Sequence, residues 1–231
     1  MSLKLLALDT STEACSAALS IDGEVTQLYQ LAPREHTHLI LGMIEKLLQD
    51  AGLKSSELDV LAFGRGPGSF MGVRVAAGVV QGIAFAHSIP VAPVSTLAAI
   101  ASVAMAQTGE TQVLSAIDAR MNEVYWGAYK QGEKGQVLLQ GEECVIAPEN
   151  APMPEQGDWL AAGTGWGSYG EVLKTRLGER CIASLDECFP SAEAIAKLAI
   201  IAYQNGEAVP AAEAVPVYLR DNVASKPKPR P

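Results

Sequence analysis

A short apolar run near the amino terminus ends in an aspartate that is followed at once by hydroxyl-bearing residues. The segment is LLALDTSTEACSAAL, from Leu5 to Leu19, and it places Thr10 and Ser11 directly after Asp9. The hydroxyls and backbone N–H groups of such a turn can hydrogen-bond phosphate oxygens. A carboxylate beside them can organise a divalent metal ion. These residues would support the binding of a nucleotide phosphate, with Asp9, Thr10 and Ser11 as candidate binding residues.

A related pattern returns once, later in the chain. Asp118 ends an apolar run as Asp9 does, and in each copy a turn glycine, Gly23 or Gly132, lies 14 residues after the aspartate (23 − 9 and 132 − 118). A spacing that repeats in this way predicts two copies of one structural unit.

The second turn is the poorer candidate for a phosphate site. Arg120, Met121 and Asn122 are bulky where a close approach of the backbone favours glycine. Asp9 and Asp118 therefore have two interpretations. They are a pair that holds metal and phosphate, or they are two aspartates that only cap the turns in which they lie, which is the commoner role.

Two glycine-rich segments each lie between a predicted strand and a predicted helix. The first, GRGPGSFMGVR (64–74), lacks the P-loop pattern and fails the GxGxxG pattern at Ser69. It is an anion site at a helix N-terminus or a tight strand-to-helix turn with Ser69 near the cap. The second, AAGTGWGSYG (161–170), would contact an adenosine or form a flexible connector, and we favour the connector.

Other catalytic constellations are missing from the sequence. His36 and His38 are two residues apart, so on a helix their side chains would point about 200° apart and would not share a metal ion. The four cysteines match neither a zinc knuckle nor a disulfide framework, and no serine lies in a GxSxG elbow. We therefore predict no catalytic residue, no metal site and no cofactor.

The elements that position these turns follow a repeated order. The pattern predicts strands over 5–8, 15–21, 25–31, 58–63 and 91–94 with helices over 36–51, 70–87 and 96–107, and then strands over 114–117, 123–130, 137–139 and 159–162 with helices over 169–177 and 192–204. A three-stranded meander followed by strand and helix units, present twice, is the plan of the actin-like (ASKHA, ribonuclease H-like) α/β fold, with mixed sheets. We expect an N-terminal subdomain at 1–108 that carries dimerisation helices, a reduced second subdomain at 109–220 and a flexible basic tail at 221–231.

The first two predicted helices are more apolar than one sheet face requires. In VRVAAGVVQGIAFA (73–86) the two polar side chains, Arg74 and Gln81, share one stripe. Either these helices cover each other inside the monomer, or their surplus apolar surface meets another chain. The candidate partner-binding residues are Leu39, Met43, Ile44, Val75, Ala76, Val79 and Ile83.

The charge balance bears on nucleic acids and membranes. The 231 residues carry 17 basic and 26 acidic side chains, a net charge of −9, which is the wrong sign for gripping nucleic acid with the whole surface. The exception is the end of the chain, KPKPRP, which is a solvated terminus or a contact to RNA. The amino terminus lacks the layout of a signal peptide, and the longest apolar stretch contains Arg74, Gln81 and glycines. We expect a cytoplasmic location and no membrane contact.

Several motifs, in this order, resemble those of the bacterial TsaB (YeaZ) family. They are LALDTSTEACSAAL, REHTHLIL, GRGPGSFMGVR, PVSTLAAIA, IDARMNEVYW, AAGTGW and VYLRDNVA, and they run from Leu6 to Ala224. The resemblance implies a non-catalytic subunit in the synthesis of threonylcarbamoyladenosine in tRNA. It implies pairing with the catalytic TsaD through helices of the N-terminal subdomain, recruitment of the ATPase TsaE, and contact with tRNA mainly through the complex. A homodimer could form when the partner is absent.

The resemblance also locates a difference from TsaD. That relative has a V-N-H-x-E-x-H run with metal-binding histidines, and the equivalent run here is VSTLAAI (94–100), with Thr96 and Ile100 at the histidine positions. Isoleucine cannot bind a metal ion. The alternative function is a small ATP-binding kinase or ATPase of the actin-like class that uses Asp9, Thr10 and Asp118.

Overall fold

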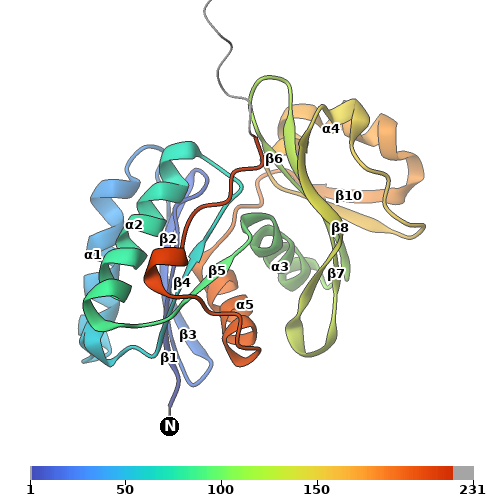
Figure 1. Cartoon of the computed structure of the whole chain (residues 1–231). Coiled ribbons are helices and arrows are strands. Elements are labelled where there is room, and N and C mark those ends of the chain that lie inside the picture. Colours follow the sequence, from blue (N-terminus) through green and yellow to red (C-terminus); the bar gives the residue numbers. More distant parts are fainter. Residues whose placement is uncertain (1, 221–231) are drawn as a thin grey trace, which may run out of the picture.

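The computed structural model describes residues 2–220 (Figure 1). Its strands are β1 (Lys4–Asp9), β2 (Ala14–Ile21), β3 (Glu24–Leu31), β4 (Val60–Gly64), β5 (Val91–Val94), β6 (Gln112–Asp118), β7 (Val124–Gln131), β8 (Val137–Ile146), β9 (Trp159–Ala162) and β10 (Cys181–Leu185). Its α-helices are α1 (His36–Asp50), α2 (Phe70–His87), α3 (Thr96–Thr108), α4 (Thr164–Leu177) and α5 (Ala192–Gln204).

Each half of the chain builds one five-stranded sheet of the same topology. The strand order is β3-β2-β1-β4-β5 in the first sheet and β8-β7-β6-β9-β10 in the second. In both sheets three consecutive strands form an antiparallel meander, and two later strands add in parallel. The predicted duplicated α/β fold with two mixed sheets is confirmed.

The helices and sheets alternate in layers (Figure 1). On the first sheet, α1 and α2 cover one face and α5 covers the other, while α3 lies between the two sheets and α4 covers the far face of the second. We call the first sheet with α1, α2 and α5 the first lobe, and the second sheet with α4 the second lobe. The central strands are buried on both faces, which explains their near-continuous apolar sequences.

Alternation along β1 decides what each side chain covers. Leu6 and Leu8 face the α1 and α2 side, whereas Leu5 and Ala7 face α5, as a period of two residues requires.

The predicted N-cap of α3 at Ser95 is confirmed, because the Ser95 hydroxyl accepts a hydrogen bond from the backbone N–H of Ala98, three residues on.

Glycines misled the prediction at the start of α4. The helix begins at Thr164, five residues before the predicted start, so most of the segment 161–170 is strand and helix and the expectation of a flexible connector is wrong. Glycine lowers helix propensity, but here it permits close packing. A β-carbon at Gly165 would lie 2.8 Å from that of Ala116. Strand β10 was not predicted, and β8 extends to Ile146, seven residues beyond its predicted end at Leu139.

One helix from the second half of the chain belongs to the first lobe. The predicted division into 1–108 and 109–220 separates the two sheets, but α5 lies in the second range and packs on the first sheet, with Ile195, Ala196 and Ala199 in the shared core. An apolar helix face is buried wherever a sheet face remains uncovered. The predicted basic tail, 221–231, lies outside the described residues.

Helix α2 is unusually apolar for its position at the edge of the fold. By length and composition it is able to cross a membrane, with 18 residues and a mean hydropathy of 1.3, despite the interruptions noted in its sequence. One third of it is buried in the chain, and its buried stripe packs on the first sheet. Val75, Val79 and Ile83 pack at the margin of this core, whereas Met71 and Phe85 are largely exposed.

Candidate functional site

The first predicted binding turn, between β1 and β2, is closed to solvent. Asp9, Thr10 and Ser11 are fully buried. The Thr10 hydroxyl donates a hydrogen bond to the carbonyl of Gly72 at 2.6 Å and accepts one from the backbone N–H of Ala76 at 3.2 Å. The hydroxyl expected to bind phosphate therefore holds the start of α2 instead.

Glycines of the segment between β4 and α2 press against this turn. A β-carbon at Gly72 would lie 2.0 Å from the Thr10 carbonyl oxygen, and one at Gly64 would lie 1.9 Å from an Asp9 carboxylate oxygen. Any other residue at these positions would force the turn to move. The glycine cluster thus allows two parts of the chain to meet, which favours its interpretation as a tight strand-to-helix turn.

The carboxylate of Asp9 is held by its own turn. It accepts hydrogen bonds from the Ser11 N–H at 3.0 Å and the Ser11 hydroxyl at 2.9 Å, and that hydroxyl accepts one from Thr96 at 3.2 Å. Burial raises the pKa of Asp9 from 3.8 to about 6, although the Ser11 hydrogen bonds act in the opposite direction. Within residues 2–220 no basic side chain forms an ion pair with it.

Asp118 is engaged in the second turn, between β6 and β7. It accepts a hydrogen bond from the Arg120 backbone N–H at 2.8 Å and forms an ion pair with the Arg120 guanidinium at 2.7 Å. In the described residues it shares no hydrogen bond or ion pair with the first turn. The structure therefore groups Asp9, Thr10 and Ser11 in one buried turn and leaves Asp118 outside that group.

The backbone of the second turn, between β6 and β7, is in an unfavourable conformation. Arg120, Met121 and Asn122 have φ angles of 60°, 57° and 60° in succession. The left-handed conformation costs a non-glycine residue about 1 kcal/mol, less for asparagine. Such strain persists only where surrounding groups hold it. The sequence showed that these residues are bulky but not that they adopt this conformation.

A polar cluster that the sequence analysis missed lies between the lobes. Glu143 of β8 forms short hydrogen bonds with the hydroxyls of Ser95 and Tyr129, and the Arg65 guanidinium lies 4.0 Å from its carboxylate. Burial and the neighbouring carboxylate hold the pKa of Tyr129 well above its usual range. The cluster links side chains far apart in sequence, and it contributes to fixing the second sheet against α3.

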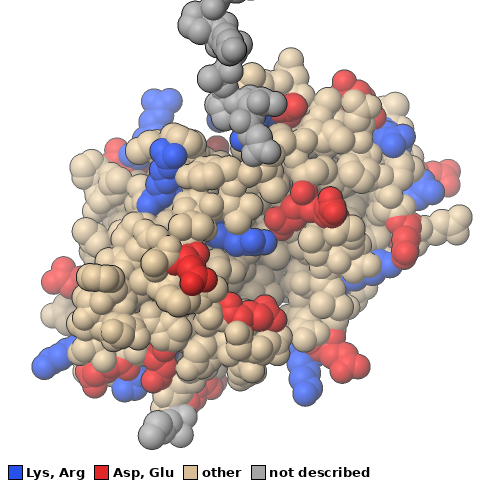
Figure 2. All heavy atoms as spheres, viewed as in Figure 1, with Lys and Arg blue, Asp and Glu red and all other residues tan. Residues whose placement is uncertain are grey.

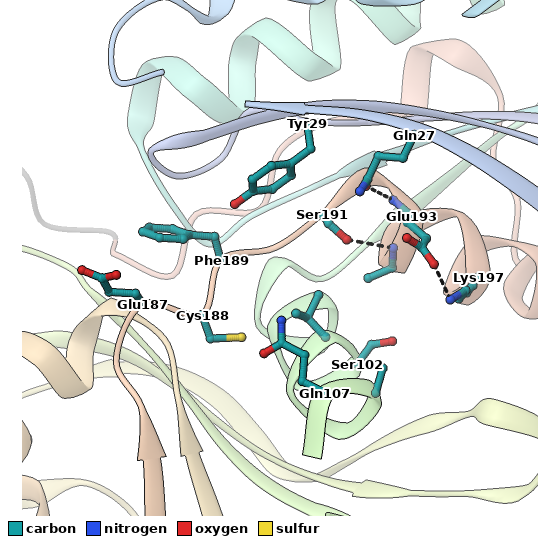
Figure 3. A pocket seen from close by; sticks show the side chains of 13 residues that line it. Gln27, Tyr29, Ser102, Gln107, Glu187, Cys188, Phe189, Ser191, Glu193 and Lys197 are labelled. Carbon is teal, nitrogen blue, oxygen red and sulfur yellow. Dashed lines mark hydrogen bonds and ion pairs between the residues drawn. The ribbon is translucent and has the colours of Figure 1, made fainter. Parts of the chain in front are cut away.

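Figure 3 shows a second feature that was not predicted, a cavity of about 410 Å³ between β3, α3 and the start of α5. The rings of Tyr29 and Phe189 lie side by side in this view, and Gln27 and Gln107 enter from opposite sides. The buried thiol of Cys188 has a pKa raised to about 12 by desolvation, so it is a poor nucleophile. The lining comes from four segments of the chain, so no local motif signals it.

The predicted partner-binding residues divide into two groups. Ile44 and Ala76 are buried in the first-lobe core, so they offer no surface to a partner, which corrects their assignment. The others, Leu39, Met43, Val75, Val79 and Ile83, are only partly buried. They lie where α1 and α2 pack over the same core, at the margin of the exposed surface.

The outward face of α2 carries apolar residues that the prediction omitted. Phe85 is 84% exposed and Met71 is 65% exposed. Gly78 and Gly82 lie between them, and a β-carbon at either would meet no atom within 4 Å. The signal was available in the sequence, because positions 71, 78, 82 and 85 share one helical face. This face is apolar and shallow at its centre, and no other segment within residues 2–220 covers it.

No group of three or more histidine, cysteine, aspartate or glutamate side chains that could hold a metal ion occurs in residues 2–220. His87 shares a hydrogen bond of 3.0 Å with Ser55, and the four cysteines are free thiols. The described residues therefore offer no ligand set for a metal ion.

Comparison with known proteins gives a consistent result. A family model described as "TsaD: tRNA N6-adenosine threonylcarbamoyltransferase" matches residues 24–228. The tRNA threonylcarbamoyladenosine biosynthesis protein TsaB of Escherichia coli is 42% identical, with 98% of this chain and 99% of that protein covered. The protein of the same name from Haemophilus influenzae is 43% identical, with 98% of each covered.

A solved structure agrees with the sequence relatives. YeaZ from Pseudomonas aeruginosa superposes with a TM-score of 0.88 at 48% identity, and the match covers 94% of this chain and all of that one. The two-lobed fold, the order of the motifs and the full-length matches lead to one assignment. The chain belongs to the TsaB (YeaZ) family.

Proposed function

We propose that this protein is a non-catalytic subunit of the machinery that makes threonylcarbamoyladenosine in tRNA, and that it binds and supports a TsaD-like catalytic subunit and helps to recruit a TsaE-like ATPase. The observation that carries the proposal is the exposed apolar face of α2 at Met71, Gly78, Gly82 and Phe85. The neighbouring turn between β1 and β2, where a phosphate would bind, is buried. The chain therefore offers a surface for a partner but no open phosphate site at this turn.

The buried first turn supports the non-catalytic part of the proposal. The Thr10 hydroxyl is hydrogen-bonded to the backbone of α2, and Gly64 and Gly72 pack directly against the turn. At the two positions that the family resemblance equates with the metal-binding histidines of TsaD, Thr96 donates to Ser11 and Ile100 lies in the apolar core. Neither side chain is available as a metal ligand.

The α2 face supports the docking part. Gly78 and Gly82 leave room for a partner helix to approach closely, and Met71 and Phe85 flank them as apolar anchors. A second copy of this chain offers the same face, so a homodimer is expected to compete with the heterodimer when the partner is scarce.

Contact with tRNA is proposed to occur mainly through the complex. Figure 2 shows basic and acidic side chains interspersed over the described part of the face in view, with no continuous basic area. The net charge of −9 opposes tight binding of RNA by this chain alone.

The test of the docking surface is a charge on the α2 face. Phe85→Asp is expected to weaken binding to the TsaD-like subunit at least about tenfold, because the aspartate would have to be desolvated without a partner. Phe85 is almost fully exposed, so the thermal stability of the monomer should change little. Binding is measured by calorimetry, and folding by circular dichroism.

A matched control is Val172→Asp, which places the same charge at an exposed apolar position on α4, in the second lobe. It should leave the affinity unchanged. Equal affinities of the wild type and Phe85→Asp would rule out the α2 face as the docking surface.

Nucleotide binding separates this proposal from the alternative of a small kinase or ATPase. Calorimetry of the isolated chain with ATP and Mg²⁺ is expected to show no binding in the micromolar range, because the turn that would receive the phosphate has no space or free hydroxyl. Micromolar binding that is lost in Asp9→Asn would contradict the proposal and support the alternative.

A further inference from the structure

The last described segment, residues 214–220, crosses from the first lobe to the second (Figure 1). We call it the strap. Its first residue, Ala214, is fully buried in the core under α1 and α2. Its last residue, Arg220, contacts the turn between β6 and β7. The strap thus contacts both lobes, and it lies about a hundred residues after the turn that Arg220 contacts.

At the first lobe, the strap is held by backbone and side-chain contacts. The Val217 N–H donates a hydrogen bond of 2.8 Å to the Arg65 carbonyl. The Tyr218 hydroxyl accepts one of 2.9 Å from Arg74, and the Arg74 guanidinium stacks 3.6 Å from the ring centre of Phe70. The rings of Phe70 and Tyr218 are 6.0 Å apart. Arg74 therefore stacks on an aromatic ring of its own helix and bonds the hydroxyl of Tyr218 in the strap, whose ring centre lies 5.6 Å from the guanidinium.

At the second lobe, Arg220 binds the strained turn. Its guanidinium donates to the carbonyls of Ala119 at 2.9 Å and Arg120 at 3.4 Å, and it pairs with the Glu123 carboxylate. The Arg220 side chain is only 15% exposed. A nearly buried guanidinium thus binds the carbonyl just before the three left-handed residues and the carbonyl of the first of them.

From these contacts we propose that the strap is a latch that works as one unit. It fixes the second turn in its left-handed conformation and holds the two lobes together beside the segment between β4 and α2. Only Leu219 separates Tyr218 from Arg220. A movement of Tyr218 therefore also moves Arg220. If the hydrogen bond between Arg74 and Tyr218 is lost, we expect Arg220 to leave the second turn as well. The strained turn is then maintained by a residue of the other lobe, Arg74.

The test compares Arg74→Ala, Arg220→Ala and the double variant in the isolated chain. Hydrogen exchange is measured at the backbone N–H groups of Ala119 and Glu123, which close the turn by bonding across it. Trypsin cleavage after Arg120 gives a second readout. Each single substitution is expected to speed exchange at the turn about tenfold, and the double variant should add little, because either change opens the same latch.

Two further variants serve as a control and as a milder alternative to Arg74→Ala. Lys197→Ala removes an exposed basic partner from α5, where it pairs with Glu193, and should leave the turn unchanged. Tyr218→Phe deletes only the hydroxyl that binds Arg74 and should reproduce part of the effect if Arg74→Ala fails to fold. An unchanged turn in both Arg74→Ala and Tyr218→Phe, or additive effects in the double variant, would show two independent contacts and overturn the latch.

Discussion

Replacing Gly72 with alanine is expected to destabilise the protein by about 3 kcal/mol or more, which places it among the large effects of overpacking. The added β-carbon would lie 2.0 Å from the Thr10 carbonyl oxygen. That oxygen belongs to the backbone of a fully buried turn, so it has no side-chain rotation with which to yield. Relief requires α2 to move away from the sheet, and the hydrogen bonds that Thr10 makes to α2 would be lost.

Urea unfolding with a spectroscopic probe gives the free energy of unfolding of Gly72→Ala, and a thermal scan should show a midpoint about 10 °C lower. Gly78→Ala is the matched control because it makes the same substitution six residues later in the same helix. A β-carbon at Gly78 meets nothing within 4 Å, so alanine should stabilise the monomer by up to about 1 kcal/mol. Equal stabilities for the two variants would contradict the closed turn described above.

The second large effect concerns the buried carboxylate of Asp9. Its folded-state pKa of about 6 lies above the ordinary value of 3.8. The folded protein therefore holds a proton that the unfolded chain releases. The stabilising contribution is fully present below pH 3.8 and is lost as the pH rises through 6. A shift of about two units corresponds to about 3 kcal/mol, an order-of-magnitude value for a fully buried group.

Asp9→Asn removes this titration while keeping a carbonyl oxygen that can accept from Ser11. We expect the free energy of unfolding of the variant, relative to wild type, to rise by about 2.5 kcal/mol between pH 4 and pH 7.5. Urea melts at several pH values measure it. The control is Asp50→Asn, which makes the same substitution at an exposed position of α1. A flat difference for Asp9→Asn would mean that the carboxylate is not desolvated in the folded protein.

In this chain the turn that would hold phosphate in an actin-like fold is packed against α2. The glycines and hydroxyls that would serve phosphate are occupied in joining β1 to α2. The buried carboxylate of Asp9 costs stability near neutral pH, while its two hydrogen bonds with Ser11 hold the shape of the turn.

Much of the fold followed from local patterns in the sequence. The ends of α2 and α5 were predicted at Phe70, His87, Ala192 and Gln204, and all four are confirmed. Hydrophobic periodicity and capping residues involve only a few neighbouring positions, so they can be recognised in the sequence without knowledge of the fold. The repeat of the three-stranded meander likewise followed from the spacing, whereas the second parallel strand of the second sheet, β10, was not predicted. The order of the motifs identified the family.

What the sequence could not decide was which groups meet across the fold. From the sequence, the turn at Asp9 could still have been an open phosphate site, although capping was the commoner role. The structure shows that Gly64 and Gly72, more than fifty residues away, close it. Ile44 and Ala76 have the same apolar character as Phe85, yet the first two are buried and the last is exposed. The hold of Arg220 on the second turn spans about a hundred residues. Side-chain type and spacing determine local conformation, whereas accessibility and partnership depend on packing between segments that only the tertiary structure brings together.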